Sequence, residues 1–507
     1  MRALLIFVLC LAAGTLACSQ GSKASPLTSP ATVTLSPSAG QSVSQGKTLD
    51  ITAQTSDASG AGVSWTLAGD GTLVNPTPTS VTYVAPTTSI GNNIVVVTAT
   101  ATANSGAQSY IAITLLPQGA LANVQAVSVN GGPVPGKIYP NRAYTSVTLC
   151  VPGTTTCQTI DGIMIDTGSV GLRVLSSQLQ ALPKLSDGAG NAVAECVQFP
   201  DQSYLWGDVV VADLRIAGEV AGSLSIHALL GPNDSSAPSD CSSAGAGANV
   251  GTQTLLGANG ILGVGYDAQD CGDFCAPTTG TPPGPDYYAC TATGCAASFV
   301  SVAQQVTNPI VMFAKDSNGV VLGFPGLSQA SPTLDGQMIF GIGTQANNQL
   351  GNAAVFTVDP SGNFTTNLAS TSQSLTSSQV NSGVSALFFP DGDFSGCAVA
   401  SSFFCPPAST NIAAVQIGGN NMQSTINFRV DNADMLFSTN PGYAAFATLA
   451  GPNGTGACSD GTGACRFEWG LPFFYGRTVY TSISGRPVPP GAPLGPWFAY
   501  GTGFTKQ

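Results

Sequence analysis

The residues of this sequence best suited to acid–base chemistry lie in Ile160–Ser169, where an apolar, strand-like run ends in Asp-Thr-Gly-Ser. An Asp followed by Gly often marks an ordinary turn, because both residues tolerate tight backbone conformations. The carboxylate of such a turn can also take a proton from water if a second carboxyl group lies close enough to share a proton with it. Asp166 is therefore a candidate acid–base residue that needs a partner.

Further segments are similar, in order, to those of the two-lobed pepsin-like aspartic proteases. "IMIDTGSVGLRV" resembles the first active-site turn of that family, and "NGILGVGY" resembles the apolar-apolar-Gly segment that crosses behind it. A helix expected from Ser298, with "VVLGFPG" and "QMIFGIG", resembles the junction of the lobes. "SGVSALFFPDG" from Ser382 resembles the second turn, and "LPFFYGRTVYTSI" from Leu471 resembles the second crossing. More narrowly, the chain resembles a family of exported bacterial proteins of unknown function.

The resemblance implies an all-β main body over residues 121–507, built as two β-barrel lobes with few short helices. The first lobe would cover about 121–325 and the second about 326–507. One Asp from each turn would form the catalytic pair, with Gly allowing the tight turn and hydroxyl groups orienting the carboxylates. The residues that match these supporting roles are Thr167, Gly168, Ser169, Ser382 and Gly383.

The position of the second catalytic Asp is occupied by Asn381. An amide can hydrogen-bond like a carboxylic acid, but it cannot ionise or pass on a proton. Because members of a catalytic unit act jointly, losing one usually costs orders of magnitude in rate. The sequence therefore predicts an aspartic-peptidase-like pseudo-enzyme, with a cleft that binds an extended peptide by strand addition.

Three alternatives keep an active acid endopeptidase open. Asp391 or Asp393, downstream of the second turn, could replace the missing carboxylate, deamidation of Asn381 could regenerate it, or the second turn could lie elsewhere. No other Asp-Thr-Gly or Asp-Ser-Gly occurs to serve as that turn. A further hypothesis is a structural or adhesive surface protein in which the cleft is vestigial.

A hairpin from Cys196 is the candidate flap over the cleft, with Tyr204 or Trp206 closing on it; the alternative is that Trp206 packs between sheets. The single histidine, His227, lies in a strand-like run, and a structural role is expected for it. With one His and no Cys-x-x-Cys, no metal and no cofactor are expected.

The N-terminal residues that precede these elements are those of an export signal. Residues 1–17 have one basic residue, an apolar core and small residues before Cys18. Leu-Ala-Cys resembles a bacterial lipobox, which implies a lipid on Cys18, a polar tether over 18–31 and an envelope protein on the outer membrane or cell surface. The alternative is ordinary cleavage near Ala17, which leaves a soluble protein.

Residues 32–118 contain six alternating or β-branched runs separated by turn residues, as in a β-sandwich. This region resembles bacterial immunoglobulin-like repeats, which implies that Trp65 is the buried core aromatic. A spacer role is expected for it. In the main body, the best helix candidates are the segment from Ser298 and a shorter one from Asn432.

Composition limits the partners. The net charge is −12, which argues against nucleic acid, and a monomer is expected. Fourteen Cys, less Cys10 and Cys18, leave an even number, as in a disulfide framework. Local pairing is expected for five close couples, with Cys196 and Cys241 left over: Cys150/Cys157, Cys271/Cys275, Cys290/Cys295, Cys397/Cys405 and Cys458/Cys465.

Overall fold

A computed structural model describes residues 31–506 except 57–58, 89, 92, 200–202, 235, 243–246, 277–279, 281–285 and 454–465. The expected export signal, the lipid site Cys18 and the Cys458/Cys465 couple lie outside these residues. Strands dominate the described part, and helices are few and short, so the all-β prediction is confirmed. In this part of the chain, no helix combines the length and apolar character needed to cross a bilayer.

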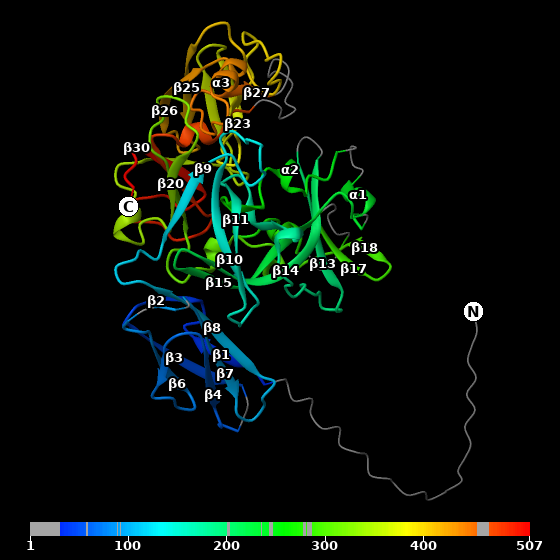
Figure 1. Ribbon diagram of the computed structural model, residues 1–507, viewed down its shortest axis with the longest axis vertical. Coiled ribbons are helices and arrows are strands. Elements are labelled where there is room, and N and C mark those ends of the chain that lie inside the picture. The colour runs from blue at the N-terminus through cyan, green and yellow to red at the C-terminus, as the bar shows by residue number, and fades with distance from the viewer. Residues whose placement is uncertain are drawn as a thin grey trace, which may run out of the picture.

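The N-terminal region forms two four-stranded sheets, seen in blue in Figure 1. The first has the order β1 (Val33–Ser36), β3 (Thr48–Thr55), β6 (Ser80–Val84), β5 (Thr72–Val74). The second has the order β2 (Gln41–Ser44), β8 (Gln108–Leu116), β7 (Ile94–Ala101), β4 (Val63–Ala68). Alternating side chains of both sheets enclose one core. Its fully buried aromatic residue is Tyr83, whereas Trp65 is only partly buried, contrary to expectation.

This region packs directly against the main body. Arg215, which is 4% exposed, donates to Val95 O (3.3 Å) and to Thr114 Oγ1 (3.1 Å) of the N-terminal sheets. Tyr110 Oη donates to Asp213 Oδ1 at 2.8 Å. A buried guanidinium needs hydrogen-bond acceptors, so removal of the N-terminal sheets would leave the Arg215 guanidinium without those it has here.

Most of the main body is one 15-stranded sheet that curls back on itself, because β14 also pairs with β10. It crosses the lobe boundary expected near residue 325, since β20 pairs with β9. Its strands, in spatial order, are β18 (Gly294–Ala297), β17 (Tyr287–Thr291), β13 (Ala192–Gln198), β14 (Tyr204–Ile216), β15 (Glu219–Leu230), β12 (Val170–Leu175), β16 (Gly260–Val264), β11 (Cys157–Asp166), β10 (Ala143–Cys150), β9 (Val124–Val129), β20 (Leu334–Phe340), β19 (Gly319–Gly323), β29 (Arg477–Ser482), β30 (Trp497–Thr502) and β21 (Ala354–Thr357).

A seven-stranded sheet forms the part drawn at the top of Figure 1. Its spatial order is β26 (Gln423–Val430), β25 (Thr410–Ile417), β22 (Phe364–Leu368), β23 (Gln373–Val380), β28 (Glu468–Trp469), β24 (Leu387–Phe389) and β27 (Ala450–Pro452). Its inner face is rich in aromatic side chains, and rings of Phe467 and Trp469 stack at 4.0 Å between centroids. One continuous apolar core joins this sheet to the 15-stranded one.

The helices are α1 (Ser239–Ser242), α2 (Gln253–Leu256) and α3 (Ala433–Thr439), with short 3-10 turns η1 (Ser176–Gln178), η2 (Gly272–Phe274), η3 (Val302–Gln304), η4 (Pro309–Met312), η5 (Ala346–Asn348) and η6 (Leu471–Phe474). The helix expected from Asn432 is confirmed: Asn432 caps α3 by accepting from Met435 N. The helix expected from Ser298 is wrong. Backbone amides of that segment donate to distant strands and loops, for example Ser298 N to Tyr287 O.

Five disulfides form in the described residues. Four of them are expected local couples, and the fifth joins the two remaining residues, Cys196 and Cys241, across 45 positions. So many disulfides are typical of a protein exported to an oxidising compartment.

Candidate active site

The first predicted turn connects two strands that are not neighbours in the sheet, because a third strand lies between them. Asp166 ends β11, and the chain turns through Ser169 into β12. Strand β16 lies between them, parallel to β11 and antiparallel to β12, so that Gly263 faces both Asp166 and Gly171. The crossing expected at "NGILGVGY" is therefore where the sequence predicts it.

The second predicted turn has the same arrangement. β23 ends at Val380, the chain turns through Asn381, and β24 leaves it. β28 lies between them, parallel to β23 with Val380 beside Trp469, and antiparallel to β24. The second crossing is thus Glu468–Trp469, just before the residues expected for it, and Leu471–Phe474 instead forms η6.

Reciprocal hydrogen bonds join the two turns. Thr167 N donates to Ser382 Oγ (3.1 Å), and Ser382 N donates to Thr167 Oγ1 (3.0 Å). Each hydroxyl then donates across to the strand before the other turn: Ser382 Oγ to Ile165 O (2.9 Å) and Thr167 Oγ1 to Val380 O (3.4 Å). Thr167 and Ser382 are 1% and 0% exposed. Because each hydroxyl is both donor and acceptor, the pair fixes the two halves against each other without a charge.

Asp166 and Asn381 hold equivalent positions in this pair. Gly168 N donates to Asp166 Oδ1, and Gly383 N donates to Asn381 Oδ1, both at 2.8 Å. A Cβ on Gly168 would lie 2.1 Å from Asn381 Nδ2, and one on Gly383 would lie 2.5 Å from Asp166 Oδ1. Each glycine is therefore required by the close approach of the side chain from the opposite turn. An acid and a neutral amide face each other across the turns.

The surroundings of Asp166 favour its protonated form. Burial raises the pKa of its carboxyl group, and the Ser169 hydroxyl, the Gly168 N–H and the Arg173 guanidinium oppose that rise. Ser169 Oγ lies close enough for this effect but makes no hydrogen bond of good geometry. Asp391 accepts hydrogen bonds from Ser370 Oγ at 3.1 Å and from Asp393 N at 3.0 Å, and no hydrogen bond joins Asp391 or Asp393 to Asp166 among the described residues.

The main body is also recognisable by comparison. Residues 119–500 match the model of a family described as protein of unknown function, DUF3443. The chain belongs to the DUF3443 family. No curated protein matches it. The family match includes both turns and leaves the two N-terminal sheets outside.

The flap candidates of this DUF3443 protein pack in a side-chain cluster that includes none of the turn residues. Trp206 is 1% exposed, donates to Ser236 Oγ at 2.9 Å and packs edge-on against Tyr288. Tyr204 packs against the same cluster. Leu205, between them, shares a different cluster with Met164 of β11. The structure therefore places Trp206 as the alternative expected it, packed between structural elements.

His227 belongs to a buried ion network beneath the first turn. Arg173 Nη2 lies 2.6 Å from Glu195 Oε1 and 3.1 Å from Asp270 Oδ2, and His227 Nδ1 lies 3.1 Å from Glu195 Oε2. Burial, followed by the Arg173 charge, lowers the pKa of His227 to about 3. The imidazole is therefore neutral, and no hydroxyl nucleophile is hydrogen-bonded to it among the described residues.

Glu468, on the second crossing strand, was not predicted from the sequence. It is 6% exposed, and Arg466 Nε lies 2.9 Å from its Oε1. Burial raises the pKa of Glu468, Arg466 opposes the rise and the Asp166 carboxylate adds to it. The charge of Asp166 therefore acts on a second buried carboxyl group. The only signal in the sequence was the rarity of glutamate, which occurs three times in the chain.

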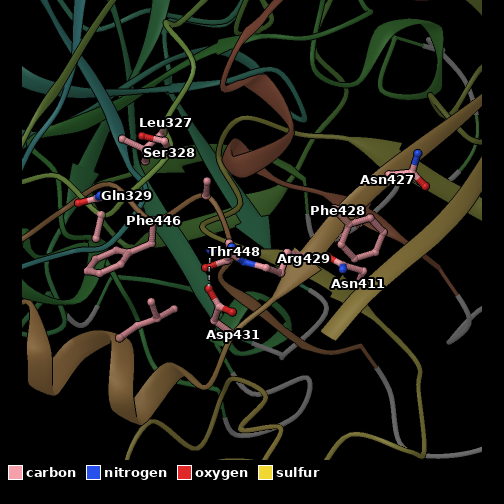
Figure 2. A pocket seen from close by; sticks show the side chains of 13 residues that line it. Leu327, Ser328, Gln329, Asn411, Asn427, Phe428, Arg429, Asp431, Phe446 and Thr448 are labelled. Carbon is pink, nitrogen blue, oxygen red and sulfur yellow. Dashed lines mark ion pairs between the residues drawn. The ribbon is translucent and has the colours of Figure 1, made fainter. Parts of the chain in front are cut away.

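A pocket of about 590 Å³ lies in the second half, against β26 (Figure 2). Its lining includes the ion pair of Arg429 with Asp431, at 3.1 Å. Phe446, also in the lining, donates its backbone N–H to Asn141 Oδ1 (2.7 Å), and Asn141 Nδ2 donates to Ser385 O (2.8 Å) after the second turn. Hydrogen bonds thus connect the pocket to the second turn, but the turn residues do not line it.

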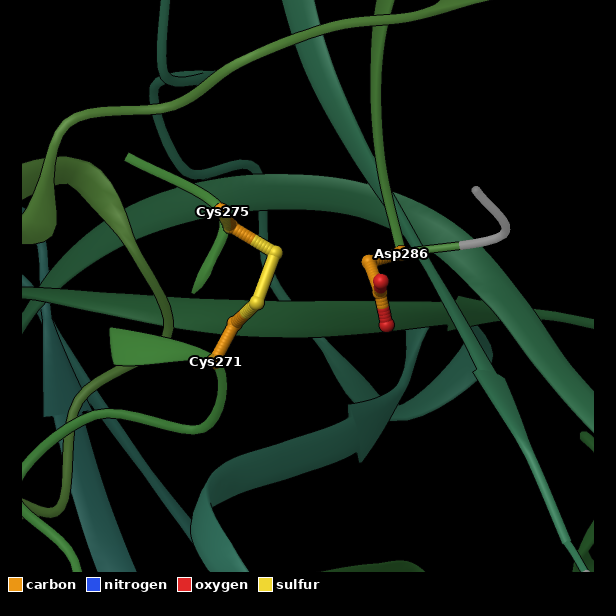
Figure 3. A group of neighbouring side chains, drawn as sticks. All are labelled: Cys271, Cys275 and Asp286. Carbon is orange, nitrogen blue, oxygen red and sulfur yellow. A yellow bond between two sulfur atoms is a disulfide. The ribbon is translucent and has the colours of Figure 1, made fainter. Parts of the chain in front are cut away.

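Cys271 and Cys275 lie beside Asp286, in a grouping with metal-ligand composition (Figure 3). Their sulfur atoms are bonded to each other, and so are those of Cys397 and Cys405, near Asp434. Disulfide sulfur is not the thiolate that binds Zn²⁺, so these residues do not fit a zinc site.

Proposed function

We propose that this protein is an exported envelope lipoprotein whose main body is a pepsin-like double lobe, with a cleft that binds an extended peptide. Hydrolysis by the usual carboxylate pair is impaired because Asn381 stands at the place of the second Asp. The observation that supports this proposal is the reciprocal pairing of the two turns, with Asp166 on one side and Asn381 on the other. Both glycines that this close approach requires, Gly168 and Gly383, are present.

The proposal extends to the N-terminal part. The paired four-stranded sheets agree with an immunoglobulin-like sandwich, and the lipid would be attached to Cys18. Because Arg215 joins the sandwich to β14, the two parts would move together on the membrane surface. In this role the sandwich sets the distance of the cleft from the lipid.

The test uses the full mature chain, a library of extended peptides and three variants: Asp166→Ala, Asn381→Asp and the control Asn104→Asp. Asn104 is an exposed amide outside the main body, so its change adds the same charge elsewhere. We expect peptide binding by the wild type, and cleavage that is slow or absent between about pH 3 and 7. Cleavage should increase by orders of magnitude in Asn381→Asp alone.

Two results contradict this proposal. Rapid, pepstatin-sensitive cleavage by the wild type that is lost in Asp166→Ala would show that the carboxylate pair is not impaired. Failure of the wild type and of Asn381→Asp to bind any peptide would favour a structural or adhesive protein with a vestigial cleft.

A further inference from the structure

Glutamate has an unusual distribution in this chain. There are three glutamates in 507 residues, Glu195, Glu219 and Glu468, and they are 2%, 6% and 6% exposed. Each interacts with the carboxyl group of an aspartate: Glu195 with Asp270, Glu219 with Asp316 and Glu468 with Asp166. Two buried carboxyl groups cannot both ionise cheaply, so each such pair favours keeping one proton. Glu468 is the member of this set that lies at the paired turns.

The two halves of the site differ at two matching positions. In the first half, Asp166 pairs with Gly263 of the crossing strand, and Ile261 lies two residues earlier. In the second half, Val380 pairs with Trp469, so Glu468 occupies the position that corresponds to Ile261. The first half therefore has its acid in the turn and an apolar residue on the crossing strand. The second half has an amide in the turn and the acid on the crossing strand.

Strand alternation determines which way Glu468 faces. Val380 and Trp469 point into the apolar core. Because successive side chains of a strand point to opposite faces, Glu468 lies on the other face, the face that carries Asn381. Arg466 binds Oε1, whereas Oε2 is buried and has no hydrogen-bond partner among the described residues. A buried carboxylate oxygen without a donor is costly, and a proton on it, or a water between it and Asp166, removes that cost.

We propose that Glu468 is the second acid–base carboxyl group of this cleft, linked to Asp166 through a bridging water, in place of the carboxylate that Asn381 lacks. The charged groups that act on Glu468 are Asp166, from the facing turn, and Arg466, on its own segment. The strands on either side place the neutral residues Gln379 and Phe388 beside it. In this proposal the Gly168 N–H stabilises the ionised form of Asp166, and Glu468 retains the one proton of the pair.

This arrangement gives the proposed peptide cleft a slow route to hydrolysis, and that consequence rests on the proposed function. Asp166 takes a proton from a water molecule as the water oxygen bonds to the peptide carbonyl carbon. Glu468 gives its proton, through a second water, to the amide nitrogen as the C–N bond breaks. The products are a carboxylic acid and an amine, and transfer of the proton from Asp166 to Glu468 restores the starting state.

The test measures the titration of Glu468 directly and does not depend on peptide binding. Protein labelled with ¹³C at the glutamate carboxyl carbon gives signals from three residues only. Loss of one signal in Glu468→Gln assigns it. We expect Glu468 in the wild type to titrate above the usual glutamate range, and its pKa to fall by about 1 unit in Asp166→Asn. The control Asp391→Asn removes another poorly exposed acid of the second half and should leave the pKa unchanged.

A second variant covers the case in which Asp166→Asn does not fold. Asn381→Asp adds a carboxylate to the face that carries Glu468, so it should raise the pKa of Glu468 further. An unchanged Glu468 pKa in either folded variant overturns the proposal. Peptide binding without this coupling would refute the role of Glu468 and leave the proposed function standing. Coupling without peptide binding would refute the proposed function and leave the carboxyl pair standing.

Discussion

The pair of Glu219 and Asp316 makes stability of this protein depend on pH in a direction that one substitution can test. Glu219 begins β15, and Asp316, which is fully buried, also accepts hydrogen bonds from Thr344 Oγ1 and Gln345 Nε2. Burial, followed by the charge of Asp316, raises the pKa of Glu219 from 4.5 to about 8. The protonated Glu219 then donates to Asp316. Glu219→Gln replaces that donor with an amide N–H that never titrates.

The direction and the size of this pH dependence follow from the linkage between proton binding and folding. A carboxyl group with a raised pKa in the folded state stabilises the fold fully below its unfolded pKa and loses this contribution as pH rises through its folded pKa. For Glu219 this loss occurs between pH 4.5, its ordinary pKa, and about pH 8, its pKa in the folded protein. At about 1.36 kcal/mol for each unit, the wild type should lose up to about 5 kcal/mol of its free energy of unfolding across this pH range. Glu219→Gln should not lose this amount.

The assay is urea unfolding followed by tryptophan fluorescence at about pH 5 and about pH 8.5, with disulfides intact. Near pH 5 the variant should lie within about 1 kcal/mol of the wild type, and near pH 8.5 it should be more stable by about 3–5 kcal/mol. Asp335→Asn, at an exposed acid, controls for the change in net charge. A difference between variant and wild type that is the same at both pH values would refute the reasoning.

Three other substitutions test the geometry of the site and its supports. Thr167→Val leaves a buried N–H of the facing turn without its acceptor and should lower the free energy of unfolding by about 1–3 kcal/mol in urea. Gly168→Ala places a Cβ 2.1 Å from the opposing amide and should abolish peptide binding in a titration, whereas Gly188→Ala, with no atom within 4 Å, should bind as the wild type does. Replacing both Cys196 and Cys241 by Ser opens a link across 45 residues and should cost about 4 kcal/mol in thermal or urea unfolding; a loss below about 1 kcal/mol would contradict the loop-closure argument.

Much of the fold was predictable because alternation and turn residues are local signals. The runs that became β3, β7 and β8 alternate or are β-branched, and the short α3 follows a capping Asn. The segment from Ser298 shows why this fails elsewhere. Its apolar spacing fits a helix, but its amides find partners on distant elements, and tertiary hydrogen bonds override a weak local preference.

The candidate site was also predictable in part. The Asp-Thr-Gly of the first turn, the loss of an acid at Asn381 and the need for glycine beside each were readable from residue types alone. The burial of Glu468 on the second crossing strand was not, because nothing in the local sequence distinguishes a buried acid from one that faces water.

The sequence by itself determined that this chain is made of strands, that it forms several local disulfides and that one acidic turn lacks a matching acid. Only the tertiary structure decided which groups surround Asp166. Contacts between residues 215 positions apart, such as those of Thr167 with Ser382, depend on how strands β11, β16, β23 and β28 are stacked and registered. The packing of whole sheets fixes the register of each strand. Whether a glutamate such as Glu468 lies at the site or on the surface is therefore decided by contacts with distant strands and not by its neighbours in sequence.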